Sequence, residues 1–264
     1  MMRKISFAVL IFLAIGCNSQ PKTESMAKAN SLAEENSAVQ TKAPVKGGCG
    51  STLVFKEGVV LLSESFDGQG KLMGKHSTTI KKVYTEAGIL FSEMEVKNSD
   101  ANGKNEKTMT SVYKCDGGQI YIDLNNFMAN DKQKSKLETS GLSFPYDPSV
   151  GDTIADANFS MKTTSSYGER TITSHIKERK VEAKESITTA AGTFECYRIS
   201  SVVSVDLDMP GMDAEDKRVM ENVKKQMGKN KMIFWYAPDI MIIKMEYYMG
   251  DKLLTRNEIT GIKK

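Results

Sequence analysis

The sequence contains few residues of the kinds that build metal or redox sites. Among its 264 residues there are only two histidines, four cysteines and one tryptophan, and no Cys-x-x-C pair occurs. Structural zinc sites and thioredoxin-like redox motifs need clustered cysteine or histidine ligands. We therefore expect no metal and no cofactor. His76 and His175 stand in charged, strand-like contexts, which favour half-exposed positions in strands.

Catalytic motifs are equally scarce. Ser111 and Ser174 are each followed by a lysine three residues later, but this Ser-x-x-Lys spacing brings the two side chains to one face only on a helix. Both pairs stand in predicted strands. The polar segment beginning at Asn98 resembles a calcium loop superficially, yet its twelfth residue is Met109 instead of a bidentate glutamate. Since no convincing nucleophile and base are present, the sequence predicts a protein that is not an enzyme, and a hydrolase is only the third hypothesis.

An excess of one charge is absent too. The chain has 36 lysines and arginines against 33 aspartates and glutamates, a formal net charge of +3, and the two signs are mixed along almost every segment. Nucleic-acid-binding proteins normally gather basic residues on one face. We therefore expect no nucleic acid as a partner. Apolar runs after the N-terminus, such as Val59–Leu62 and Ile240–Ile243, have the length of strands and not of membrane-spanning helices.

The one long apolar run stands at the N-terminus, in MMRKISFAVLIFLAIGC. Arg3 and Lys4 precede the eleven-residue, predominantly apolar run Ile5–Ile15, and a glycine stands directly before Cys17. A run of this length is too short to span a bilayer, so residues 1–16 are interpreted as a lipoprotein signal peptide that is removed. Cys17 is then predicted to carry acyl chains, palmitate among them, that anchor the mature protein to a membrane.

A tether is predicted between the lipid and the folded domain. Residues 17–48 begin with the lipidated cysteine, and from Asn18 to Lys46 there is no aromatic residue. Such a segment cannot bury enough apolar surface to offset the entropy of ordering it. Because no acidic cluster follows Cys17, we expect a bacterial cell-envelope protein anchored in the outer membrane and facing the periplasm.

Residues 49–264 show the pattern of a single antiparallel β domain. Alternating segments such as Ile89–Val96 are separated by turns rich in Asp, Asn and Gly, which favour hairpins between neighbouring strands. About eleven strands are predicted, too many for a flat sheet, so we expect an all-β fold in which one large curved sheet forms a barrel or half-barrel. Among the predicted strands are Lys107–Cys115, Thr153–Thr163, Arg170–Arg179 and Lys180–Thr188. A short helix is predicted near residues 131–137, and one amphipathic helix, over residues 213–227, is inserted before the last strands.

Three cysteines remain in the mature chain besides Cys17. In an oxidising compartment two of them can pair and leave one free. The sequence leaves three pairings open among Cys49, Cys115 and Cys196.

Methionine is concentrated near the C-terminus. Eight of the sixteen methionines lie between Met209 and Met249. Thioethers are soft ligands for Cu(I), but they also fill adaptable apolar grooves. Because no histidine or cysteine stands nearby, we favour packing or a groove over copper.

Three strings resemble one protein family. They are CDGGQIYIDL at Cys115–Leu124, KVEAKESITT with AGTFECY at Lys180–Tyr197, and WYAPD at Trp235–Asp239, which KMEYY follows. They resemble the TapB-like group of bacterial envelope proteins, related to a larger family of unknown function, over most of residues 49–264. The resemblance implies an exported, curved antiparallel β domain, and it implies no catalytic residue.

These expectations combine into a lipid-anchored envelope protein that binds an apolar or amphipathic ligand, such as a lipid or a glycan, without enzymatic activity. A sheet of this size either fills its interior or leaves a cavity, and the amphipathic helix can lie across the open side. The alternative is a structural or assembly accessory that binds another envelope protein through a strand edge or the helix. The candidate lining residues, which core packing explains equally well, are Phe91, Tyr113, Tyr121, Phe194, Trp235 and Tyr247.

Overall fold

The structure is a computed structural model, and it describes residues 48–123, 136–139, 141–165, 168–208 and 230–264 together with Glu215 and Arg218. The predicted signal peptide, Cys17 and nearly all of the tether lie outside these residues. So does the amphipathic helix expected over residues 213–227, apart from Glu215 and Arg218, which are helical and exposed.

The described residues form strands almost throughout, and every strand belongs to one antiparallel sheet. Two short 3₁₀ turns, η1 (Cys49–Ser51) and η2 (Leu53–Phe55), precede the sheet. The strands are β1 (Val60–Asp67), β2 (Leu72–Glu86), β3 (Ile89–Asp100), β4 (Lys107–Cys115), β5 (Gln119–Asp123), β6 (Lys136–Thr139), β7 (Leu142–Pro145), β8 (Thr153–Ile154), β9 (Ala157–Ser165), β10 (Gly168–Thr189), β11 (Gly192–Asp208), β12 (Asn230–Ala237), β13 (Met241–Met249) and β14 (Lys252–Lys263).

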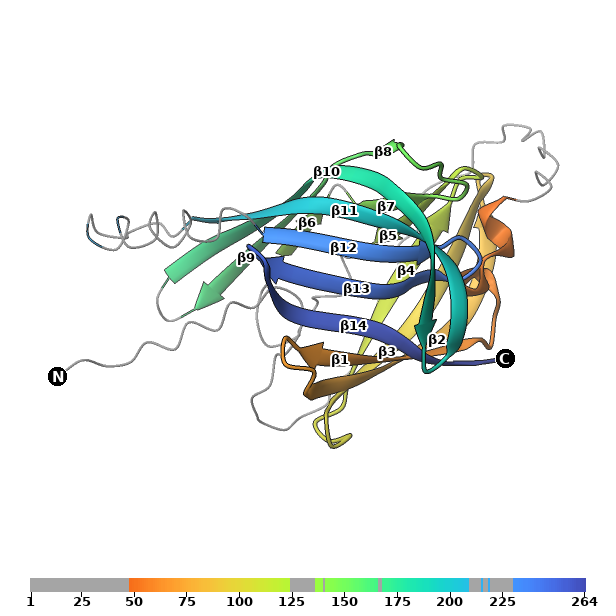
Figure 1. The fold of residues 1–264 in the computed structure, drawn as a ribbon, viewed down its shortest axis with the longest axis horizontal. Helices are drawn as coiled ribbons and strands as arrows, with labels where there is room; N and C mark the ends of the chain where they lie inside the picture. The colour runs from red at the N-terminus through yellow and green to blue at the C-terminus, as the bar shows by residue number, and fades with distance from the viewer. Residues whose placement is uncertain are drawn as a thin grey trace, which may run out of the picture. The chain divides into compact units, whose positions relative to one another are not determined.

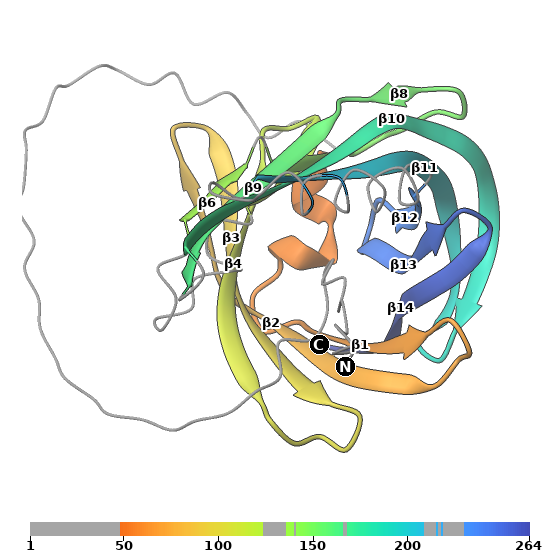
Figure 2. The ribbon, with the colours of Figure 1, turned by 90° about the vertical axis from the view of Figure 1, so that its left-hand side faces the viewer.

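The sheet curls into a nearly closed barrel (Figure 2). Its strand order is β6-β9-β10-β11-β12-β13-β14-β1-β2-β3-β4-β5-β7, and β8 pairs with β10 beside this path. The first and last strands of the chain are neighbours, with Val60 of β1 opposite Lys263 of β14. The two ends of the path also approach each other, because β7 contacts β8 and β9. The all-β, barrel-shaped fold predicted from the sequence is confirmed.

The hairpin turns follow from their aspartates and glycines. In the β1–β2 turn, Oδ1 of Asp67 accepts hydrogen bonds from the backbone N–H groups of Gln69 and Lys71, and Gly70 has a φ of +83°. Asp100 is used in the same way in the β3–β4 turn, and the bond from the Lys104 N–H is the main reason that its pKa is lowered. The Asp100 carboxylate accepts hydrogen bonds from the turn backbone, so the segment that resembled a calcium loop is a hairpin turn.

Several strand boundaries differ from those predicted, and the described residues contain fourteen strands instead of about eleven. β10 runs for 22 residues across a position where two strands were expected to meet, because a bulge with Glu178 at φ +54° absorbs the irregularity. The strand expected over residues 153–163 is divided into β8 and β9. Lys136 and Leu137, expected at the end of a short helix, begin β6, and the rest of that predicted helix lies outside the described residues.

Successive side chains of each strand point alternately into the barrel and away from it, and these two faces are here called the inner and the outer wall. Phe144 of β7 stacks on Tyr236 of β12, with 5.2 Å between ring centroids and 15° between planes, and it meets Phe234 edge-on at 5.5 Å. Since β7 and β12 are not neighbours in the sheet, these rings meet across the interior. Phe144, Phe234 and Tyr236 therefore mark the inner wall, and Trp235, which lies between two of them in sequence, faces outward.

Residues 48–58, here called the plug, lie at one end of the barrel interior (Figure 2). The backbone N–H of Leu53 donates to the carbonyl of Asp239 in the β12–β13 turn, at 2.8 Å. From the other side, the hydroxyl of Ser92 in β3 donates to the carbonyl of Val54, at 2.5 Å. Leu53, Val54 and Phe55 are all buried, so the plug closes this end of the interior with apolar side chains.

A disulfide bond fastens the plug to the sheet. It joins Cys49 of η1 to Cys115 at the end of β4, and Cys196 is a free, buried cysteine. The structure thereby selects one of the three pairings that the sequence left open.

The far end of the β10–β11 hairpin bends across the outer side of β12–β14 (Figures 1 and 2). Nε1 of Trp235 donates a hydrogen bond of 2.6 Å to Oε1 of Glu185 on this hairpin. Although it belongs to the outer wall, Trp235 is consequently only 7% exposed.

Candidate ligand-binding site

One stretch of the inner wall, here called the methionine wall, combines polar and thioether side chains. It lies on β12, β13 and β14, toward the ends of β12 and β13 that are remote from the plug. The inward direction follows from the register, because the inward-facing Phe234 is opposite Met245 and Met245 is opposite Asn257. The members of the methionine wall are Asn230, Met232, Met245, Tyr247, Met249 and Asn257.

Each polar residue of the methionine wall has a methionine as a direct cross-strand partner. Asn230 is opposite Met249, Tyr247 is opposite Met232, and Asn257 is opposite Met245. Side chains in such positions are neighbours on one face of the sheet. Methionine is flexible and polarisable, so it adapts to contacts of different shapes.

Four polar atoms of the methionine wall are buried without a hydrogen-bond partner among the described residues. They are Nδ2 and Oδ1 of Asn230, the hydroxyl of Tyr247 and Oδ1 of Asn257. Asn230 is 2% and Tyr247 5% exposed. Burial raises the pKa of Tyr247 to about 12, against the opposing effect of the neighbouring Asn230 side chain. Proteins rarely leave buried polar atoms unpaired, since each costs about 1–3 kcal/mol. These atoms are suited to bonding a polar group that enters the barrel.

A hydrogen-bonded chain continues the inner wall beyond Asn257. Ser65 of β1 is the direct partner of Asn257, and its Oγ lies 2.5 Å from Nε2 of His76 on β2. Nδ1 of His76 lies 2.6 Å from Oδ1 of Asn98 on β3. Because an amide oxygen only accepts, Nδ1 carries the proton, and Nε2 is left to accept from the Ser65 hydroxyl. Burial lowers the pKa of His76, which favours this neutral form.

The sequence alone predicted neither the methionine wall nor the Ser65–His76–Asn98 chain, because both depend on how strands pair. Ser65, His76 and Asn98 come from three strands, so no spacing along the chain connects them. Asn230 has a weak local signal, because it begins the inward alternation that Met232, Phe234 and Tyr236 continue. Recognising that position requires the register, which only the structure supplies.

Two of the predicted lining residues lie on the inner wall. Tyr247 belongs to the methionine wall, and Tyr113 is opposite Ser92, whose hydroxyl points to the plug. Burial raises the pKa of Tyr113 to about 12. Phe194 is half-buried near the turn of the β10–β11 hairpin.

The other predicted lining residues are on the outer wall and do not join them. Phe91 stacks on Tyr84 with 5.2 Å between centroids. Tyr121 is 37% exposed and donates its hydroxyl to Asp116, and Trp235 lies under the β10–β11 hairpin. The six aromatic residues therefore do not form one site.

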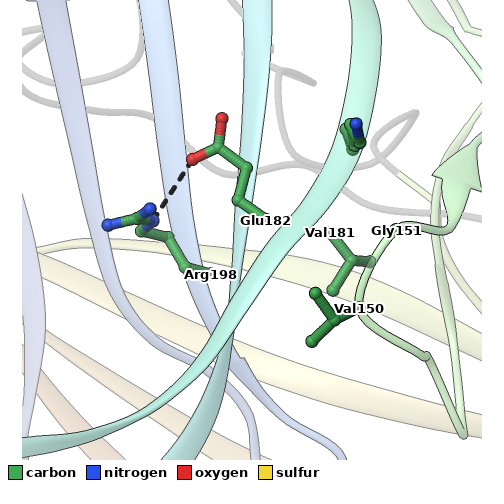
Figure 3. A pocket seen from close by; sticks show the side chains of 6 residues that line it. Val150, Gly151, Val181, Glu182 and Arg198 are labelled. Atoms are coloured by element: carbon green, nitrogen blue, oxygen red, sulfur yellow. Dashed lines mark ion pairs between the residues drawn. The ribbon is translucent and has the colours of Figure 1, made fainter.

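A shallow pocket of about 380 Å³ lies on the outer side of β10 and β11 (Figure 3). Nε of Arg198 is 3.2 Å from Oε2 of Glu182, so the carboxylate neutralises the guanidinium. The pocket is open, and Val150 at its rim is 57% exposed. Its lining residues are Val150, Gly151, Lys180, Val181, Glu182 and Arg198.

Comparison with known proteins assigns the family. Residues 56–258 match the DUF3108-like family. The chain belongs to the DUF3108-like family. This is a family of unknown function, as the sequence resemblance implied, and the narrower TapB-like assignment stays a prediction. No curated protein matches the chain.

Two crystal structures share the fold of this DUF3108-like domain. One is a protein from Bacteroides fragilis, assigned as exported and with a YmcC-like fold, which is 18% identical and has a TM-score of 0.58 over 79% of this chain and 97% of its own. The other is a protein from Parabacteroides distasonis, assigned as a lipoprotein, which is 17% identical and has a TM-score of 0.57 over 79% of this chain and 96% of its own. In the described part of the chain, no helix has the length and apolar character needed to cross a membrane.

Proposed function

We propose that this protein is a lipid-anchored protein of the bacterial cell envelope that binds an amphipathic ligand inside its barrel without transforming it. The N-terminal signal and Cys17 support the anchor. The two similar structures, one assigned as exported and one as a lipoprotein, support the same location. We place the anchor in the outer membrane, with the barrel facing the periplasm.

The unpartnered polar atoms of the methionine wall carry this proposal. An apolar interior that served only as a core would pair such atoms or replace them by apolar groups. Here they stand beside flexible methionines, so the same surface offers apolar contact and free hydrogen-bonding groups. This combination suits a ligand that is itself partly apolar and partly polar.

Native mass spectrometry of the full lipidated protein, purified from its own host in a detergent of known mass, tests the proposal. We expect a stoichiometric mass in addition to the acylated chain, identified after extraction as an amphipathic molecule. A chain without such a mass would contradict ligand binding. If crosslinking in cells then recovered a stoichiometric envelope protein, the alternative function, an assembly accessory that binds another envelope protein, would replace ligand binding.

Metabolic labelling with palmitate tests the anchor separately. We expect labelling of the wild-type chain and its loss in Cys17→Ala. Equal labelling of both chains would show that Cys17 is not the acylated residue.

One observation favours a second candidate function, ester hydrolysis. Ser65, His76 and Asn98 have the order of a nucleophile, a base and a residue that orients the base. In such a reaction Oγ of Ser65 attacks the acyl carbonyl while Nε2 of His76 takes the hydroxyl proton and passes it to the leaving alcohol. Water then hydrolyses the serine ester. Ser65 is only 1% exposed, which is why ligand binding remains the first proposal.

A fluorophosphonate probe distinguishes these functions. Hydrolysis requires that the probe label Ser65 and that labelling be lost in Ser65→Ala and His76→Gln but kept in Ser111→Ala, which changes another buried serine. A folded wild-type protein without labelling would remove the second candidate.

A further inference from the structure

We infer that the methionine wall, together with Lys252 at its rim, binds an anionic head that also bears hydroxyl groups, as in a phosphoglycerol lipid. The inference rests on the proposed function and names the class of its ligand. Two separate observations carry it: a lysine at the rim of the wall, and buried amide oxygens farther in that need a hydrogen-bond donor.

Lys252 gives the methionine wall a positive charge at its rim, where the β13–β14 turn lies. It is the direct partner of Met249, which is in turn the partner of Asn230, so the three side chains belong to one face of the sheet. Lys252 is exposed, and it forms no ion pair with any residue that the structure describes. Its ammonium is therefore available to an anionic group that reaches the rim.

Two carboxylates stand near this rim, and neither pairs with Lys252 in the described part of the chain. The β1–β2 turn lies against the start of β14, since a Cβ on Gly68 would be 2.0 Å from the carbonyl oxygen of Leu253. In that turn Asp67 is already occupied, because its Oδ1 accepts two backbone N–H groups. Asp251 precedes Lys252 and is exposed, so solvent screens its charge.

The acidic side chains farther along β13 and β14 do not face the wall. They lie on the outer wall, where each is paired with a cation: Glu246 with Lys244 at 2.7 Å and Glu258 with Arg256 at 3.3 Å. An anion at the inner face is therefore not opposed by these carboxylates.

Arg179 adds a positive charge inside the barrel. It is 0% exposed, it stacks on Phe144 at 5.0 Å, and its two terminal nitrogens donate to the carbonyls of Ala155 and Ser143. Its Nε is buried without a hydrogen-bond partner among the described residues. Burial lowers the pKa of Arg179 to about 10, against the opposing effect of Asp156, so the guanidinium is charged at neutral pH. The field of this cation favours a negative ligand.

The amide oxygens of the wall require a ligand group that donates. Oδ1 of Asn230 and Oδ1 of Asn257 are buried without a partner among the described residues, and an amide oxygen only accepts. Neither an ionised phosphodiester nor an acyl chain has a donor to offer. A hydroxyl donates to such an oxygen and accepts from Nδ2 of Asn230. The head therefore needs hydroxyl groups as well as a negative charge.

The order of these groups along the wall indicates how the head enters. Lys252 and Asn230 flank Met249 at the rim, and Asn257, opposite Met245, lies farther in. This order places the anionic group at the rim and the hydroxyls deeper. Met249 is 41% exposed, so it offers apolar contact to the chain that follows the head. Its thioether also rotates easily, because methionine has three rotatable bonds, and this rotation opens a path to the buried atoms.

Three probes with the same dodecyl chain test the head class on the full-length protein freed of co-purified lipid. Dodecyl phosphoglycerol has the charge and the hydroxyls, dodecyl glucoside has hydroxyls alone, and methyl dodecyl phosphate has the charge alone. Below their micelle concentrations, we expect dodecyl phosphoglycerol to bind at least 10-fold more tightly than either of the others.

The other outcomes separate the inference from the proposed function. Equal or tighter binding of dodecyl glucoside would overturn the recognition of charge, and equal or tighter binding of methyl dodecyl phosphate would overturn the need for hydroxyls. Either result would overturn the inference and leave the proposed function standing. If none of the three probes bound, the proposed function would itself fail.

A lysine substitution tests the rim. We expect Lys252→Gln to weaken the binding of dodecyl phosphoglycerol at least 5-fold and to leave that of dodecyl glucoside unchanged. Lys263→Gln is the matched control, because Lys263 is an exposed lysine at the other end of the same strand, and it should bind all probes as the wild type does. Unchanged binding in Lys252→Gln, or an equal loss in both variants, would contradict the role of Lys252.

An asparagine substitution tests the deeper part of the wall. Asn230→Leu replaces the amide by an apolar side chain of similar size, so we expect at least 10-fold weaker binding of both hydroxyl-bearing probes and little change for methyl dodecyl phosphate. Asn102→Leu, in the exposed β3–β4 turn, is the control and should bind as the wild type does. Asn257→Leu supplies a second test if the first variant does not fold. Unchanged binding of the hydroxyl-bearing probes to a folded Asn230→Leu or Asn257→Leu chain would contradict the inference.

Discussion

Nε1 of Trp235 on β12 donates a hydrogen bond of 2.6 Å to Oε1 of Glu185, fifty residues earlier on the bent β10–β11 hairpin. The ammonium of Lys244 lies 4.4 Å from the centroid of the same indole ring. One aromatic side chain thus joins a hairpin to the outer wall that it covers, by a charge-assisted hydrogen bond and a cation–π contact.

The first prediction concerns this contact. We expect Glu185→Ala to lower the free energy of unfolding by about 1–2 kcal/mol, because the indole N–H loses its charged acceptor. Trp235 is the single tryptophan, so its fluorescence reports the site directly, and its emission should shift to longer wavelength in the folded variant. Glu195→Ala, which removes an exposed carboxylate of the same hairpin, should leave both the emission and the stability unchanged. A blue-shifted or unaltered emission in Glu185→Ala would contradict the assignment.

The second prediction concerns the disulfide. Cys49 and Cys115 are 66 residues apart, and closing a loop of that length stabilises a chain by roughly 4 kcal/mol in the loop-entropy account. We expect the Cys49→Ala, Cys115→Ala double variant to unfold at correspondingly lower urea concentration. Thiol titration of the denatured, unreduced wild type should find one free thiol on residues 49–264, that of Cys196. Three free thiols would mean that the bond does not form in the protein.

The third prediction concerns pH. Because burial lowers the pKa of His76 in the folded state, the unfolded chain binds the proton more readily as the pH falls through about 6.5, the ordinary value for histidine. The contribution of His76 to stability is therefore complete above that pH and is lost below it. We expect urea unfolding to show a smaller difference between pH 7.5 and pH 5.5 in His76→Gln than in the wild type. An identical pH dependence in His76→Gln and the wild type would contradict the role of His76.

The fourth prediction concerns close backbone approach. A Cβ on Gly68, in the β1–β2 turn, would lie 2.0 Å from the carbonyl oxygen of Leu253 on the neighbouring β14 side. Since backbone cannot move aside cheaply, we expect Gly68→Ala to destabilise the fold by about 2 kcal/mol or more. Gly118 has no atom within 4 Å of a Cβ and no positive φ, so Gly118→Ala should be close to neutral. Equal thermal unfolding of the two variants would contradict the packing of the turn against β14.

The features predicted from the sequence are those that short segments determine. β4 begins and ends at the predicted residues, Lys107 and Cys115, because alternation and the flanking Asp-Gly turns act locally. The pairing of β1 with β14 unites strands from the two ends of the domain, and no local pattern encodes it. The plug was expected only as the start of the domain. Its path through the interior depends on contacts with β3 and the β12–β13 turn, which are distant in sequence.

The candidate site was the least predictable part. Aromatic residues were favoured as ligand contacts because they are large and apolar, yet Trp235 and Phe91 are held on the outer wall by partners on adjacent strands or a covering hairpin. The concentration of methionine was visible in the sequence, and its meaning came from the register that places Met232, Met245 and Met249 opposite polar residues. A one-residue change of register would have reversed every one of these directions.

The disulfide also determines where a pulling force would act. Tension on the chain before Cys49 passes through the disulfide to Cys115 at the end of β4. Residues 50–114 form the loop that this bond closes, and the loop does not lengthen under load. The strands β1, β2 and β3 lie within that closed loop, and they are the strands that hold Ser65, His76 and Asn98. If the proposed lipid anchor ties the barrel to a membrane, this part of the inner wall is shielded from tension that acts through the anchor.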